Sequence, residues 1–128
     1  MKERLYKKNN PYHLPRTLYR RVIAVIRDYR RQREEVNNIL YGSHFSEIAV
    51  KGGLPKSSVE SIAIRLEKYT ADIEAVEKAL ERIPAEYQKG VFENIADGKR
   101  FPEGACYKTW LRWRKKFIWY TAEELKLV

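Results

Sequence analysis

The sequence predicts an all-α protein with two long helices, paired as a hairpin or as a coiled coil, followed by a short helix-turn-helix-like module. Three observations lead to this fold class. Apolar residues recur at three- and four-residue spacings over most of the 128-residue chain, which is typical of amphipathic helices. Most glycines and prolines fall between these periodic segments and mark their ends. No stretch alternates apolar and polar residues over a useful length, as a half-buried strand would.

The first long helix is predicted over residues 15–40, after a basic, flexible arm at residues 1–14. Pro15 suits the first turn of a helix, and Gly42 is a good helix stop. A loop rich in glycine is expected over residues 42–56, with a short turn at 45–50. The apolar residues of the first helix form one stripe, opposite its arginines: Leu18, Val22, Ile26, Tyr29, Val36, Ile39 and Leu40.

The second long helix is predicted over residues 57–83 and completes a helical region that spans residues 15–83. Its apolar residues alternate spacings of four and three, which is the seam of a coiled coil. The seam consists of Ile62, Leu66, Tyr69, Ile73, Val76, Leu80 and Ile83. This spacing fits equally a homodimer formed through the Ile62–Ile83 seam and an antiparallel hairpin within one chain.

Residues 84–128 are predicted to form the helix-turn-helix-like module. Pro84 breaks the preceding helix and can begin the next one, over residues 85–97. Gly98 ends that helix, a compact connection follows, and a last helix is predicted over residues 104–125. One apolar stripe of the last helix is expected to pack on the helix at 85–97, and it consists of Cys106, Trp110, Trp113, Phe117 and Tyr120. On this stripe, Cys106 is expected to be a small buried hydrophobe rather than a nucleophile.

The other side of the last helix is basic. Lys108, Arg112 and Lys115 recur at helical spacing, with Arg114 and Lys116 beside them, and no acid occurs between Tyr107 and Lys116. Lysine and arginine bind phosphates, and arginine can bond a guanine edge with two hydrogen bonds. The sequence therefore predicts a double-stranded DNA contact on this helix, with Lys99 and Arg100 of the preceding connection as additional basic residues.

The distribution of charge agrees with a polyanionic partner. Residues 1–33 hold eleven basic residues against two acids, residues 34–98 hold seven against twelve, and residues 99–128 hold eight against three. Two basic ends around an acidic middle favour nucleic acid, and the arginines of the first helix are candidates for further phosphate contacts. A membrane-surface role for residues 20–33 is disfavoured because this segment lacks the tryptophan and phenylalanine of interfacial helices.

Other kinds of chemistry have little support in the sequence. His13 and His44 are far apart and have no carboxylate at metal-ligand spacing, and no glycine-rich phosphate-binding motif is present. We therefore expect no enzyme activity, no cofactor and no metal site. One cysteine, no signal-peptide pattern and no apolar run of membrane-spanning length favour a cytoplasmic protein without a membrane partner.

Three segments resemble the C-terminal half of the RinA/ArpU-like phage transcriptional regulators: Ile83-Pro84-Ala85-Glu86-Tyr87-Gln88, residues 109–118 from Thr109-Trp110-Leu111-Arg112 onward, and Ala122-Glu123-Glu124-Leu125. The resemblance covers about residues 57–126. That family carries a helix-turn-helix similar to region 4 of sigma factors and is associated with late gene expression in phages and prophages. It usually has an additional short helix before the recognition helix, where this chain has only residues 99–104.

The resemblance implies a divergent, shortened regulator of transcription in a bacterial host cell, with RNA polymerase as a candidate partner besides DNA. Lys108, Thr109 and Arg112 match the exposed early turns of the recognition helix, and Arg114, Lys115 and Lys116 match positions that contact the DNA backbone. The alternative that the residues leave open is an oligomeric phage assembly, packaging or adaptor protein, similar to a small terminase, that binds DNA without sequence preference or not at all.

Overall fold

The computed structural model describes residues 11–41 and 56–128, and these residues contain four helices and no strand. The helices are α2 (Arg16–Tyr41), α4 (Lys56–Glu81), α5 (Ala85–Asp97) and α6 (Tyr107–Glu124). The prediction of an all-α chain is confirmed for this part of the protein. The predicted loop at 42–56 and its turn at 45–50 lie outside the described residues, apart from Lys56, which begins α4.

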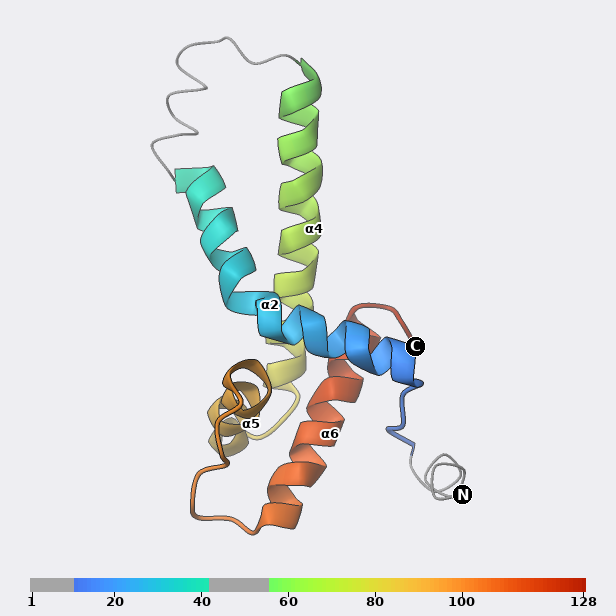
Figure 1. Ribbon diagram of the computed structural model, residues 1–128, viewed down its shortest axis with the longest axis vertical. Helices are drawn as coiled ribbons and strands as arrows, with labels where there is room; N and C mark the ends of the chain where they lie inside the picture. The colour runs from blue at the N-terminus through green and yellow to red at the C-terminus, as the bar shows by residue number, and fades with distance from the viewer. Residues whose placement is uncertain (1–10, 42–55) are drawn as a thin grey trace.

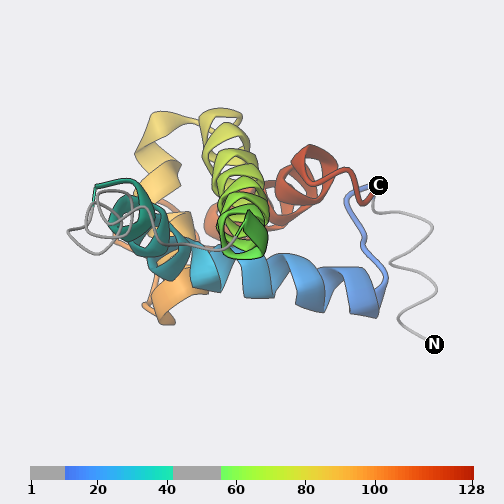
Figure 2. The same ribbon diagram turned by 90° about the horizontal axis from the view of Figure 1, so that it is seen from above.

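The two long helices cross near mid-height in Figure 1, and the two short helices pack below the crossing. In Figure 1 the C-terminal half of α2 runs beside α4, whereas its N-terminal half crosses over α4 and α6. Viewed from above, this N-terminal half passes one side of α4, and α6 lies beside α4 (Figure 2). Each of the four helices contacts the other three.

The hydrophobic core lies where the four helices converge. Each helix contributes at least one completely buried side chain, and these include Ile26 of α2, Val76 of α4, Ile95 of α5 and Phe117 of α6. All four belong to one cluster of apolar contacts. Burial of a large aliphatic or aromatic side chain contributes about 1.5–3 kcal/mol, so this junction holds α6 in a fixed orientation.

The apolar seam of α4 is used within the chain near the core. Ile73, Val76 and Ile83 are buried, whereas Ile62 and Leu66, nearer the start of α4, are only half-buried. Polar side chains also join the two long helices: the Tyr29 hydroxyl donates to the Glu77 carboxylate at 2.8 Å, and the Gln32 amide donates to Asp72 at 3.2 Å. Near the core, the α2 and α4 arms of the hairpin therefore contact each other within one chain.

The last helix begins three residues later than the sequence predicts. Gly104 has a φ of 117°, which excludes it from a right-handed helix, and Cys106 is an extended N-cap residue with φ −71° and ψ 150°. At the other side of the connection, Gly98 ends α5 with a left-handed φ of 68°. Residues 99–106, between the end of α5 and the start of α6, contain no helix.

Part of the predicted flexible arm is packed instead. Leu14 is buried in the core cluster. The Tyr12 ring lies edge-on to two rings of α6, with centroid distances of 6.2 Å to both Trp119 and Tyr120. The expectation of a mobile arm over residues 1–14 was therefore wrong for residues 12–14, because aromatic side chains about a hundred residues away provide their packing surface.

Candidate nucleic-acid interface

The orientation of α6 is set by Trp110, which is 4% exposed. Its ring stacks on Phe101 of the connection at a centroid distance of 5.4 Å and an interplanar angle of 10°, and Tyr87 of α5 meets it edge-on at 5.0 Å. Tyr87 also stacks on Trp113. Aromatic pairs of this kind add about 0.5–1.5 kcal/mol beyond the burial of their area. The predicted packing of the tryptophans on α5 is therefore present.

Tyr120, the last residue of the predicted apolar stripe, packs elsewhere. The guanidinium carbon of Arg82, which directly follows α4, lies 4.0 Å from the centroid of the Tyr120 ring. Arg82 also forms ion pairs with Glu123 at 3.1 Å and Glu124 at 3.5 Å. The two acidic residues of α6 are therefore paired with Arg82 at the C-terminal end of the helix, away from the basic residues of its first turns.

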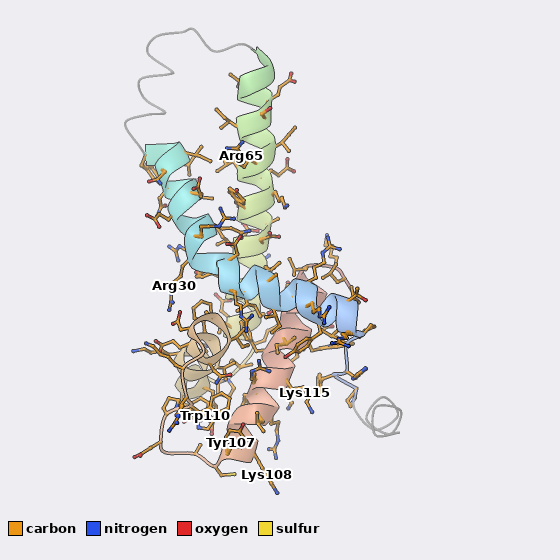
Figure 3. The ribbon with its side chains drawn as sticks, viewed as in Figure 1. Arg30, Arg65, Tyr107, Lys108, Trp110 and Lys115 are labelled. Carbon is orange, nitrogen blue, oxygen red and sulfur yellow. The ribbon has the colours of Figure 1, made fainter. Side chains whose placement is uncertain are left out.

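The basic face of α6 consists of Lys108, Leu111, Arg112 and Lys115, all of which are exposed. They line a shallow depression of about 440 Å³ together with Tyr12 and Lys116. Figure 3 shows Lys108 and Lys115 projecting from α6 on the side turned away from Trp110. Within the described residues, no carboxylate forms an ion pair with Lys108, Arg112 or Lys115. The structure thus brings these predicted site residues together on one open surface.

Lys116 lies at the edge of the basic face and is half-exposed. Its ammonium nitrogen is 4.7 Å from the centroid of Trp113 and 5.6 Å from that of Tyr12. These cation–π contacts hold the lysine against two aromatic rings while its charge stays next to the depression. Lys116 is therefore more restrained than Lys108 or Lys115.

Arg114 does not share the basic face with the other cations. Its Nε donates to the amide oxygen of Asn94 on α5 at 2.9 Å, and one terminal nitrogen donates to the Tyr19 hydroxyl of α2 at 3.2 Å. The assignment of Arg114 to a DNA-contacting position is not supported by this placement, because the guanidinium joins α6 to two other helices.

Lys99 and Arg100 lie in the connection between α5 and α6. The Lys99 ammonium pairs with Glu93 at 3.0 Å, and its backbone carbonyl accepts a hydrogen bond from Asn94 at 2.8 Å. Arg100 is exposed. Neither residue is among those that line the depression on α6.

The arginines of α2 divide into two groups, apart from Arg27, whose Nε donates a hydrogen bond to the Ile95 carbonyl at 3.2 Å. Arg30, Arg31 and Arg33 form ion pairs with Asp97, Asp28 and Glu77, respectively. The second group occupies the first half of the helix, is exposed and forms no ion pair within the described residues; it consists of Arg16, Arg20 and Arg21. Only the first half of α2 therefore offers uncompensated positive charge for phosphate contacts.

Cys106 is exposed, contrary to the expectation of a buried hydrophobe. The prediction was wrong because α6 begins at Tyr107, which places Cys106 before the helix instead of on its apolar stripe. Backbone N–H groups of Thr109 and Lys108, and then the Thr109 hydroxyl, lower the pKa of the Cys106 thiol by hydrogen bonding to sulfur. The Thr109 side chain therefore points to the N-cap residue, with Oγ1 3.9 Å from the sulfur.

Three exposed or half-buried residues of this region were not predicted from the sequence as part of the site. Tyr12 joins the site only through long-range aromatic contacts, so no local signal identifies it. Leu111 and Tyr107 are apolar side chains on the basic side of α6 and are 38% and 67% exposed. The signal that could have identified them is their spacing from the cations, since Leu111 follows Lys108 by three residues and precedes Lys115 by four, and Tyr107 precedes Leu111 by four.

Residues 11–41 and 56–128 contain neither a metal-binding cluster nor a helix that could span a membrane. No group of three histidine, cysteine, aspartate or glutamate side chains there is arranged to hold a metal ion. His13 is half-buried, and His44 lies outside the described residues. None of the described helices combines the length and the apolar character needed to cross a membrane.

Comparisons with known proteins found no match among protein-family models, curated proteins or solved structures.

Proposed function

We propose that this protein binds double-stranded DNA through the basic face of α6. The observation that carries the proposal is the acid-free, exposed row of Lys108, Arg112 and Lys115 on a helix whose opposite side is fixed by buried aromatic residues. The major groove of DNA admits an α-helix, and the first turns of such a helix reach the base edges. A rigidly held helix limits the entropy lost on binding.

The resemblance of residues 57–126 to the RinA/ArpU-like regulators supplies the biological role in this proposal. The protein would regulate transcription in a phage or prophage, with RNA polymerase as a further partner. α5 would serve as the supporting helix and α6 as the recognition helix. The connection packed at Phe101 would stand in place of the additional helix of that family, and Lys108 in the first turn of α6 is exposed.

Fluorescence anisotropy with labelled duplexes tests the DNA contact. We expect the logarithm of the binding constant to fall linearly with the logarithm of salt concentration, with a slope of about −0.9 for each phosphate neutralised. Arg112→Ala is expected to weaken binding and relax base preference, whereas Lys116→Ala weakens binding equally for all sequences. Arg65→Ala is the matched control, because Arg65 is an exposed arginine on α4 at the other end of the molecule (Figure 3).

Selection of bound sequences from a random duplex pool at moderate salt tests the regulatory role. An enriched motif supports a regulator of transcription. Retention of DNA without enrichment supports packaging or architecture instead. Affinity that does not change with salt, or equal loss in Arg112→Ala and Arg65→Ala, would contradict binding through α6.

A second candidate function is oligomeric assembly, and one observation favours it. Large apolar side chains are exposed toward the tip of the helical hairpin, where α2 ends and α4 begins: Leu40, Tyr41, Val59 and Ile64. Exposed apolar surface of this kind marks interaction sites. Sedimentation analysis separates the two functions, because a high, ring-like oligomer favours assembly and a monomer or dimer favours the regulator.

A further inference from the structure

Leu111 occupies an unusual place for a leucine. It lies in the basic face of α6 and is 38% exposed, whereas its neighbour Trp110 is 4% exposed. Residues three and four apart are neighbours on a helix surface, so Lys108 and Lys115 flank Leu111 along the helix. The core cluster and the half-buried residues packed on it do not include Leu111. Its side chain therefore does little to stabilise the fold.

Leu111 and Tyr12 are the apolar residues that line the depression, and the other four residues are cations. Phosphate oxygens offer no favourable contact to an aliphatic side chain. The edges of base pairs in the major groove do, because thymine carries a C5 methyl group there. This methyl group is absent from the minor groove and from the backbone, so it is the apolar feature of DNA that a leucine on a groove-facing helix can meet.

We propose that Leu111 determines sequence specificity by contacting a thymine methyl group, while the adjacent Arg112 bonds the edge of a neighbouring guanine. This inference rests on the proposed function, since it requires α6 to enter the major groove. It assigns different tasks to neighbouring residues of one face. Lys108 and Lys115 supply affinity for phosphates, and Leu111 and Arg112 select the bases.

The test uses the duplex enriched by the wild-type protein and compares it with duplexes in which single thymines are replaced by deoxyuracil. This replacement removes one methyl group and leaves all hydrogen-bonding groups of the base unchanged. At one position we expect wild-type affinity to fall about fourfold, the factor that corresponds to one buried methyl group. Leu111→Ala is expected to bind the thymine and deoxyuracil duplexes equally. Ile64→Ala, which truncates an exposed apolar residue of α4, is expected to keep the wild-type difference.

The outcomes separate this inference from the proposed function. Wild-type affinity that is indifferent to deoxyuracil at every position, a methyl dependence that persists in Leu111→Ala, or DNA retention without an enriched motif overturns the role of Leu111. Each of these leaves binding through Arg112 and Lys115 intact. Absence of duplex binding, or binding unaffected by Arg112→Ala, overturns both. Because Leu111 is exposed, the thermal unfolding of Leu111→Ala is expected to match that of the wild type, which excludes misfolding as the cause.

Discussion

Gly90 illustrates how a single position fixes the orientation of the proposed recognition helix. A Cβ atom at this residue would lie 2.7 Å from Cζ3 and 2.8 Å from Cη2 of Trp110, and 2.9 Å from Cδ of Pro102. These distances are shorter than van der Waals contact, and the neighbours are a rigid ring and a proline. The absence of a side chain at residue 90 therefore lets α6 and the connection approach α5 closely.

Gly90→Ala is expected to lower the free energy of unfolding by about 1–3 kcal/mol, the usual cost of overpacking a core. In an exposed helix the same change would instead stabilise by roughly 1 kcal/mol, because alanine is the better helix former. Urea unfolding measures the difference. Introducing Gly90→Ala into a Trp110→Leu background serves as control, since much of the clash is removed there and the cost should shrink. A gain in stability of the single variant would contradict the close packing.

The residues of the candidate site were predictable to different degrees. Lys108, Arg112 and Lys115 share a face because helical spacing alone places them there. Arg114 was assigned to the same surface, but its orientation depends on Tyr19 and Asn94, which are distant in sequence. Tyr12 was not predicted as a site residue, because its contacts with Trp119 and Tyr120 also join residues that are distant in sequence. Cys106 was misplaced by a boundary error of three residues, because the extended backbone before Tyr107 has no clear sequence signal.

At the scale of the elements, the periodicity of apolar residues predicted the four helices, but not which helices contact one another. The seam of α4 fits a partner helix in the same chain or in another, because an apolar stripe does not encode the origin of its partner. Polar contacts between α2 and α4 show where the two helices of one chain meet. Tyr29 donates to Glu77, and Arg33 donates to the Tyr29 hydroxyl at 3.0 Å and to Glu77 at 3.2 Å. This network joins α2 to α4 within the hairpin.

Removing the Tyr29 hydroxyl is expected to weaken this junction. Tyr29→Phe should lower the free energy of unfolding by about 0.5–1.5 kcal/mol, the usual net contribution of a hydrogen bond. Burial raises the pKa of Tyr29 above its ordinary value of 10.0. Because the folded-state pKa is raised, the contribution of the neutral phenol is fully present below the ordinary pKa and is lost as pH rises through the folded-state value.

The measurement is urea unfolding of wild type and Tyr29→Phe, from neutral pH to well above the ordinary tyrosine pKa. The difference between the two proteins should be constant near neutrality and should shrink in strongly alkaline solution. Effects of the other tyrosines cancel in this difference because both proteins contain them. A difference that grows at alkaline pH would show that the phenolate is the form preferred by the folded protein, and would contradict the assignment.

At the scale of the whole molecule, two surfaces of different character lie at opposite ends. Exposed apolar side chains such as Ile64 lie toward the tip of the hairpin, and the basic face of α6 lies at the base (Figures 1 and 3). The 26-residue α4 runs between them and is about 39 Å long at roughly 1.5 Å per residue. This length exceeds the Debye length of about 8 Å at physiological ionic strength, so charges near the tip have little direct effect on DNA at the base.

The two ends should therefore respond independently to substitution. Ile64→Glu is expected to leave duplex affinity within about twofold of wild type, because screening removes the influence of the new charge. Lys115→Glu should weaken binding about tenfold or more, since a carboxylate then faces the phosphates. Anisotropy titrations at one salt concentration measure both, and circular dichroism checks that each variant is folded. Loss of DNA binding in a folded Ile64→Glu protein would show that the basic face acts only in an oligomer built through the tip, and would favour the assembly function over an independent regulator.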